Sequence, residues 1–223
     1  MRILGINGLN HDAAVCVIED GKILFGAHSE RYSGIKNDYN LNDAIMEEAL
    51  SYGKPDKIAW FERPYLKKVR QLYAGQYNEV FTKQNTPKEY LKKFDIHQDI
   101  TYVQHHLSHA SAGYFTSPYD EACVIVLDAI GEFECATIWY VKDGKFEKRW
   151  SQKYPNSLGL WYSAMTQRLD LKPQEDEYIL MGMAGWGEKN EELKKEIYES
   201  FFNVDSPLPI ESKLNLHRGC LGW

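Results

Sequence analysis

The first third of the chain changes from strand-like to helix-like hydrophobic patterning. The stretches RILGING and AAVCVIEDGKILFGAHSE alternate apolar and polar residues as strands do, and Asp20-Gly21 between two apolar runs is typical of a tight hairpin. Residues 41–49 then place apolar side chains on one helical face, with a cap candidate at Asn40 or Asn42, and a short apolar run follows. The pattern predicts antiparallel strands, a helix and a short buried strand.

The alternation continues along the rest of the chain. Residues 64–94 predict a helix, a break and a helix, and the strand ITYVQ leads into a histidine-rich segment. The run ACVIVLDAI then opens a second cycle and is apolar on both faces, as in a strand covered on both sides. Asp143-Gly144 predicts another hairpin, and the last third has helical patterning. We expect an α/β fold, with a first subdomain at residues 1–118 and a second, partial subdomain at residues 119–223.

The composition narrows the class of protein. The 223 residues are 43% hydrophobic and 26% charged, which is typical of a globular chain with a core of its own. A net charge of -6 and the lack of a basic block mean that nucleic acid is not expected as a partner. No apolar run approaches the ~18 residues of a membrane span, and the N-terminus does not read as a signal peptide. We therefore expect no membrane association and a cytoplasmic location.

The four cysteines are scattered, without a CxxC pair. Cys16 and Cys123 fall inside apolar, strand-like runs. The sequence therefore predicts buried, reduced thiols rather than a disulfide or zinc framework.

The stretch VQHHLSHASAGYF contains three histidines within five positions. If a helix begins near Gln104, His105 and His109 lie four residues apart on one face and can converge on one ion, whereas His106 points elsewhere. Two imidazoles suit Fe(II), Zn or Mn and would need at least one more ligand, usually a carboxylate. A zinc protease is excluded because His106 stands where its catalytic glutamate would be. The alternative is that these histidines only cap a helix.

Three further groups of polar residues follow predicted strands. In GINGLNHDAA, the glycines around Gly8 could let backbone N–H groups approach an anion, and His11 and Asp12 could deprotonate a hydroxyl. In LDAIGEFE, the acidic strand end and glycine turn could hold Mg²⁺ or a nucleotide phosphate. In SERYSGIK, two cations could clamp a phosphate or carboxylate. The acidic strand end and glycine turn consist of Asp128, Gly131 and Glu132, and the two cations are Arg31 and Lys36. Each group, taken alone, is also typical of an ordinary turn or of charged residues on a solvent-exposed surface.

Taken together and in this order, these motifs resemble those of a known family. The matching stretches are GINGLNHDAAVCVIEDGKI, SERYSGIKND, VQHHLSHASAGYF, VLDAIGEFECATIW and SLGLWYSAMTQRLDLKPQEDEYILMGMAGWG. From residue 3 to about residue 187, the chain resembles the N-terminal part of the O-carbamoyltransferase family, which includes nodulation and antibiotic-tailoring enzymes. The resemblance implies the duplicated, ribonuclease H-like fold of actin, sugar kinases and chaperone ATPases. Its first subdomain would have a mixed sheet with flanking helices, and the second would be incomplete.

The resemblance also implies roles for individual residues. His105 and His109 would hold Fe(II) or another divalent metal. Nucleotide phosphates, as ATP or carbamoyl-adenylate with Mg²⁺, would lie near Gly8 and near Asp128 and Gly131. The carbamoyl group would meet the acceptor hydroxyl at a catalytic group made up of His11, Asp12 and Lys36.

The chemistry implied by the family is carbamoyl transfer to a small-molecule hydroxyl acceptor. Carbamoyl phosphate and ATP would first form carbamoyl-adenylate in a separate C-terminal domain. Since family members are longer, we expect a fragment, a split-gene product or a remnant that does not complete transfer by itself. We also expect its exposed apolar surface to bind either a second copy of the chain, giving a homo-oligomer, or the missing polypeptide. The alternatives are a non-catalytic nucleotide-binding or partner-binding remnant, and a relative of the enzyme that threonylcarbamoylates tRNA.

Overall fold

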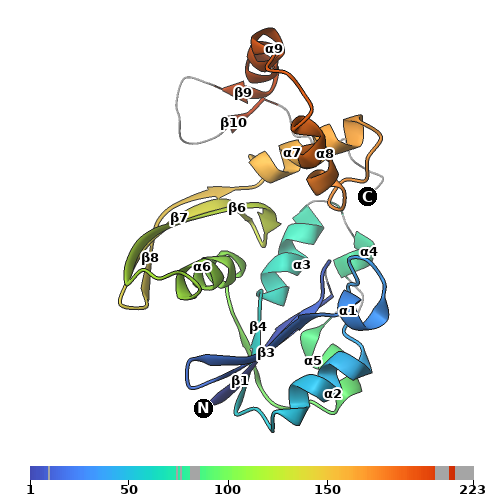
Figure 1. Cartoon of the computed structure of the whole chain (residues 1–223), viewed down its shortest axis with the longest axis vertical. Coiled ribbons are helices and arrows are strands. Elements are labelled where there is room, and N and C mark those ends of the chain that lie inside the picture. Colours follow the sequence, from blue (N-terminus) through green and yellow to red (C-terminus); the bar gives the residue numbers. More distant parts are fainter. Residues whose placement is uncertain (10, 74, 76, 81–85, 204–210, 214–223) are drawn as a thin grey trace. The chain divides into compact units, whose positions relative to one another are not determined.

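The computed structural model describes the chain except residues 10, 74, 76, 81–85, 204–210 and 214–223 (Figure 1). Its internal contacts form two compact units, residues 1–108 and 109–223. The division falls within helix α6 (His105–Phe115), whereas the sequence places the boundary after residue 118. Among the described helices, none is both long enough and apolar enough to cross a bilayer.

A five-stranded mixed sheet forms the centre of the first unit. Its strands are β1 (Arg2–Asn7), β2 (Ala14–Glu19), β3 (Lys22–His28), β4 (Lys57–Trp60) and β5 (Ile100–Tyr102), in the order β3-β2-β1-β4-β5. The first three are antiparallel, and β4 and β5 run parallel to β1. The predicted Asp20-Gly21 hairpin joins β2 to β3. The prediction of an α/β fold with a mixed sheet is confirmed, and three antiparallel strands followed by parallel ones agree with an actin-like first subdomain.

Strand alternation and one amphipathic helix build the core of this unit. Leu4, Ile6, Val15 and Val17 are buried at alternate positions of β1 and β2, as the period of two requires. The predicted helix is α2 (Asp43–Ser51), which buries one face in the same core. Of the two cap candidates, it is Asn42 that caps the helix, because its side-chain oxygen accepts a hydrogen bond from the backbone N–H of Ile45 at 3.1 Å.

The remaining helices of the first unit are short. They are α1 (Glu30–Ser33), α3 (Pro64–Tyr73), α4 (Tyr77–Val80), α5 (Pro87–Leu91) and a 3₁₀ turn, η2 (Lys92–Phe94). The two helices predicted for residues 64–94 are present as α3 and α5, whereas α4 and η2 were not predicted; residues 74, 76 and 81–85 of the predicted break lie outside the described residues.

The three parallel strands of this sheet end at one edge. Because β1, β4 and β5 run in the same direction, the residues that follow them lie along their common carboxyl edge, where open α/β sheets bind ligands. Gly8 follows β1, Glu62 follows β4, and His105 follows β5. The topology thus places three polar or turn-forming positions, far apart in the sequence, at one edge.

The second unit combines an antiparallel sheet with helices. The sheet contains β6 (Glu121–Gly131), β7 (Glu134–Lys142) and β8 (Lys145–Lys153), in that order. It is followed by α7 (Leu158–Arg168), α8 (Glu177–Ala184), α9 (Glu191–Phe201) and the short pair β9 (Phe202–Asn203) and β10 (Glu211–Ser212). The predicted Asp143-Gly144 hairpin and the helical last third are both confirmed.

The burial predicted for Cys123 is wrong, whereas the exposed apolar surface expected from the sequence is present on β6. In the described structure Ile125 and Leu127 are 62% and 60% exposed, and Cys123 on the same face is exposed too. These side chains lie at alternate positions of β6, on a face that stays largely open to solvent in the described structure. Cys16 is partly buried and Cys135 is buried, while Cys220 lies outside the described residues.

Candidate functional site

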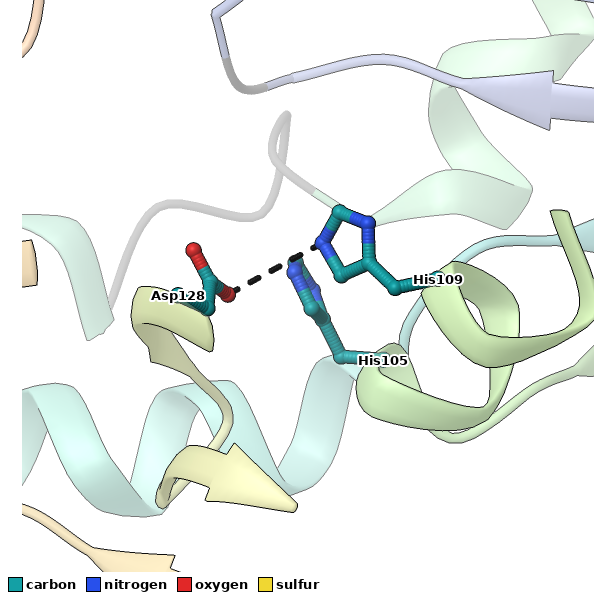
Figure 2. A group of neighbouring side chains, drawn as sticks. All are labelled: His105, His109 and Asp128. Atoms are coloured by element: carbon teal, nitrogen blue, oxygen red, sulfur yellow. Dashed lines mark ion pairs between the residues drawn. The ribbon is translucent and has the colours of Figure 1, made fainter. Parts of the chain in front are cut away.

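Two histidines of α6 and one aspartate of β6 form a group of potential metal ligands (Figure 2). His105 and His109 lie one turn apart on the same helix, as their spacing predicts, and His106 does not belong to the group. Within the second unit, Nε2 of His109 lies 3.9 Å from Oδ2 of Asp128. The three residues each offer one ligand atom, and these atoms lie within 4.8 Å of one another.

The backbone that carries Asp128 is held by the start of α7. Ser157 accepts a hydrogen bond from the N–H of Leu160 and donates one to the carbonyl of Ala129, at 3.1 Å and 2.6 Å. Gly159 in the first turn has no room for a side chain, because a Cβ there would lie 2.7 Å from Cα and N of Ala129. Asp128 therefore sits on an irregular stretch of β6 that a helix cap and a close backbone contact keep in place.

The donor set fits a first-row divalent ion. Two imidazoles and one carboxylate are the ligands of many non-haem iron sites, and they also suit zinc and manganese. With metal–ligand distances of about 2.1 Å, the atoms that coordinate one ion lie at most about 4.2 Å apart. His105 is buried, whereas the side chain of His109 is 53% exposed, which leaves one side accessible to water or a substrate.

A buried ion pair lies beside His105 in the first unit. Glu62 is buried directly after β4, with Oε2 3.8 Å from Nδ1 of His105 and Oε1 2.8 Å from Nζ of Lys67 on α3. Burial, the largest influence, raises the pKa of Glu62, but His105 and the Lys67 ammonium outweigh it and leave this pKa below its usual value. Glu62 is therefore a carboxylate at neutral pH.

A small hollow opens at the same carboxyl edge. It is lined by Leu9, Trp60, Glu62, Pro64, Lys67, Lys68, Gln71 and Pro87. Among the described residues, the buried indole N–H of Trp60 has no hydrogen-bond partner. The hollow thus combines aromatic and aliphatic walls with a charged floor.

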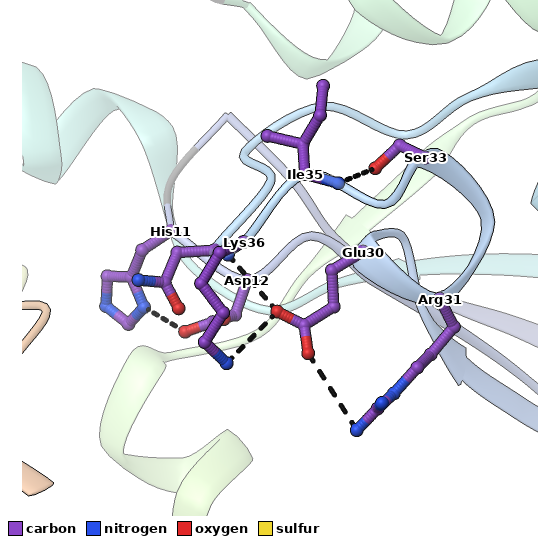
Figure 3. A network of polar contacts seen from close by, with 8 residues as sticks. His11, Asp12, Glu30, Arg31, Ser33, Ile35 and Lys36 are labelled. Atoms are coloured by element: carbon purple, nitrogen blue, oxygen red, sulfur yellow. Dashed lines mark hydrogen bonds and ion pairs between the residues drawn. The ribbon is translucent and has the colours of Figure 1, made fainter.

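His11 and Asp12 form a dyad in the turn after β1 (Figure 3). Nδ1 of His11 lies 2.9 Å from Oδ2 of Asp12. Asp12 has a left-handed backbone (φ 56°), and its carbonyl accepts a hydrogen bond from the Asn7 side chain at 2.9 Å. A carboxylate on Nδ1 leaves Nε2 of the imidazole as the basic nitrogen, which is the arrangement of a general base.

The two cations predicted to clamp an anion share one internal carboxylate (Figure 3). Nζ of Lys36 lies 3.3 Å from Oε2 of Glu30, and the Arg31 guanidinium lies 3.9 Å from Oε1. The backbone N–H of Asn37 donates to the same carboxylate and is the main reason that the pKa of Glu30 is lowered, with Lys36 contributing as well. Lys36 and Arg31 are otherwise largely exposed and can reach an anion from solvent.

The remaining predicted phosphate-binding residues lie in turns. Gly8 directly follows β1, and a Cβ there would lie 3.4 Å from the rings of Trp60 and Tyr90. Gly131 ends β6, and the buried Glu132 has a left-handed backbone (φ 59°) in the turn to β7. Phosphate binding at Gly8, Gly131 and Glu132 stays a prediction.

Sequence reasoning missed two members of these groups. The sequence predicts Asp128 near a phosphate, which stays a prediction, and does not predict its place beside the histidines; it does not single out Glu62. The available signal was the same for both, an acidic residue at the end of an apolar strand.

Comparison with curated proteins finds similar chains of greater length. An uncharacterized protein of Synechocystis is 29% identical over 83% of this chain and 35% of its own length. The nodulation protein NolNO of Sinorhizobium fredii is 22% identical over 89% of this chain and 31% of its own. An uncharacterized protein of Methanocaldococcus jannaschii is 23% identical over 97% of this chain and 47% of its own. The chain thus spans less than half the length of these relatives.

Among solved structures, two Ppx/GppA structures from Aquifex aeolicus align with 92% of this chain and 66% of their own, at 16% identity and a TM-score of 0.36. The family model described as "Carbamoyltransferase N-terminus" matches residues 2–206. Since this match extends over nearly the whole sequence, the chain belongs to the carbamoyltransferase N-terminus family.

Proposed function

We propose that this chain is the transfer portion of a carbamoyltransferase, which delivers a carbamoyl group from carbamoyl-adenylate to a hydroxyl of a small-molecule acceptor. Family membership and the similarity to NolNO support the reaction class. The observation that carries the proposal is the convergence of His105, His109 and Asp128, because it supplies a metal-type donor set within a chain of this family.

The proposed ion, Fe(II) or another divalent metal, would be held by His105, His109 and Asp128. When bound, it would polarise an oxygen of the donor as a Lewis acid.

The chain's own residues would handle the proton and the negative charge. His11 would take the hydroxyl proton on Nε2 while Asp12 holds Nδ1, so that the acceptor oxygen can bond to the carbamoyl carbon. The bond from that carbon to the adenylate oxygen would break, and AMP would leave with the bonding electrons. Lys36 and Arg31 would stabilise the anionic donor.

The donor, carbamoyl-adenylate, would be formed outside this chain portion. Carbamoyl phosphate, ATP and Mg²⁺ would be converted to carbamoyl-adenylate by a further domain or a separate chain, and the phosphates would approach Gly8 and the turn at Asp128, Gly131 and Glu132. A cytoplasmic location remains a prediction from the sequence.

The first test measures metal binding. The purified chain is equilibrated anaerobically with Fe²⁺, and bound iron is measured for the wild type and for His105→Ala, His109→Ala and Asp128→Asn. Each variant should retain at least roughly tenfold less iron, whereas His97→Ala, which removes an exposed histidine paired with Asp95, should match the wild type. Equal iron in all five proteins would refute the proposed centre.

The second test measures transfer. With carbamoyl phosphate and ATP alone, the chain should give no product. With carbamoyl-adenylate supplied by an added adenylate-forming domain, it should release AMP and carbamoylate members of a panel of hydroxyl compounds, as detected by mass spectrometry. Iron binding without acceptor-dependent product would favour a non-catalytic binding protein, and retention of tRNA on a filter would favour the tRNA-modifying relative.

A further inference from the structure

The end of β4 holds the first turn of α6 through several contacts within the first unit. Glu62 faces Nδ1 of His105 at 3.8 Å. The Phe61 ring packs edge-on against the His105 ring, with centroids 5.4 Å apart. Ser108, one turn along α6, donates a hydrogen bond to the carbonyl of Phe61 at 2.8 Å. Backbone, ring and carboxylate thus all restrict the His105 side chain.

The carboxylate of Glu62 is itself held in place. Lys67 on α3 lies 2.8 Å from its other oxygen, and both side chains are largely shielded from water. A buried carboxylate with a paired ammonium stays charged and has little freedom to turn away. The remaining oxygen of Glu62 is the one that faces His105.

An imidazole offers a lone pair to a metal on one nitrogen only if the proton sits on the other. In metal sites of many proteins, a carboxylate accepts that second N–H, which fixes the tautomer, orients the ring and raises the basicity of the ligating nitrogen. Nδ1 of His105 and Oε2 of Glu62 are 3.8 Å apart, about 1 Å beyond ordinary hydrogen-bond distance, so the hydrogen bond requires a closer approach of the two groups than the structure shows.

We propose that Glu62 is a positioning residue for His105. Its carboxylate accepts the Nδ1–H proton and leaves the lone pair on Nε2, the nitrogen then available to the ion. Lys67, 2.8 Å from Oε1, holds the Glu62 carboxylate in this orientation. This inference rests on the proposed function for its metal role, whereas the tautomer of His105 is a property of the chain without metal.

The competing explanation is that the Glu62–Lys67 pair only stabilises the start of α3. Two variants separate the explanations. Glu62→Gln keeps the size and one acceptor oxygen but removes the charge, and Glu62→Ala removes both. Glu89→Gln is the matched control, because Glu89 forms a similar ion pair with Lys92 on the surface of the same unit.

The first measurement is made on the metal-free chain. Long-range ¹H–¹⁵N spectra at mildly alkaline pH report which nitrogen of each histidine carries the proton, and the His105 signals are assigned by their loss in His105→Gln. We expect the Nδ1–H form of His105 in the wild type and in Glu89→Gln. In Glu62→Ala the population should move to Nε2–H, and Glu62→Gln should retain most of the Nδ1–H form.

The second measurement is a titration with Co²⁺, followed by its visible absorption. We expect Glu62→Ala to weaken Co²⁺ binding by about 10- to 100-fold, Glu62→Gln to weaken it less, and Glu89→Gln to leave it unchanged. Thermal unfolding of each variant separates a loss of fold from a loss of positioning.

The two proposals can fail separately. If the wild type does not bind Co²⁺ while the tautomer still depends on Glu62, the metal centre fails and the positioning role stands. If His105 is Nε2–H in the wild type, or if Glu62→Ala changes neither the tautomer nor the Co²⁺ affinity, the positioning role is overturned.

Discussion

Replacing Gly159 by alanine should destabilise the second unit, although the same substitution usually stabilises a helix. In an ordinary helical position, alanine is favoured over glycine by about 1 kcal/mol. At Gly159, however, the new Cβ would lie 2.7 Å from Cα and N of Ala129 and 2.8 Å from the carbonyl carbon of Asp128. All three are backbone atoms, so neither side can turn away as a flexible side chain would.

The magnitude follows from this overlap. Forcing an extra methyl group into a filled space costs about 1–3 kcal/mol. Subtracting the helix-propensity gain of about 1 kcal/mol leaves a net loss in the free energy of unfolding of up to about 2 kcal/mol. Because relief of the overlap must displace the backbone that carries Asp128, metal affinity should fall in the same variant.

Gly182 provides the matched control. It also lies within a helix, α8, but a Cβ there would meet no described atom within 4 Å. Gly182→Ala should raise the free energy of unfolding by about 0.5–1 kcal/mol. Urea unfolding of the two variants and the wild type, followed by circular dichroism, gives both values. Stabilisation by Gly159→Ala equal to that of Gly182→Ala would refute the account of this contact.

Three further experiments test the remaining claims. In the reconstituted transfer reaction, His11→Ala should lower turnover by roughly 10²-fold, as expected for loss of a general base. Lys36→Ala should mainly raise the donor concentration needed for half-maximal rate. Wild-type kinetics in both variants would contradict these two roles. Asn42→Ala should cost about 1 kcal/mol of unfolding free energy through loss of the α2 cap, measured by urea unfolding, and an unchanged midpoint would contradict the cap. In a Cys220→Ser background, iodoacetamide should alkylate the exposed Cys123 before Cys16. The reason is that burial raises the pKa of the Cys16 thiol, so its reactive thiolate forms only at higher pH. Peptide mass spectrometry measures the order of alkylation, and alkylation of Cys16 first would contradict the prediction.

Local features were predictable because their causes are local. The hairpins at Asp20-Gly21 and Asp143-Gly144 depend on turn chemistry between apolar runs, and the cap at Asn42 depends on a few neighbouring residues. The pairing of His105 with His109 follows from the helical period alone.

Features that depend on packing between distant segments were not predictable in the same way. Asp128 and the histidines are separated by about twenty residues of sequence, and Glu62 meets His105 only because β4 and β5 are neighbours in the sheet. The exposure of Cys123 was also missed, because an apolar strand does not reveal from its own sequence which of its faces another element covers.

The edge position of β6 has a consequence for the protein in solution. In the described structure residues 121–127 of this strand pair with β7 on one side, and the backbone N–H and C=O groups along their other side are open to another strand. Between Glu121 and Asp128 it has no charged residue that would oppose such pairing. Solubility at high concentration should therefore be limited by this edge rather than improved by the net charge of -6, and one lysine at Ile125 should raise it more than several charges placed elsewhere on the surface.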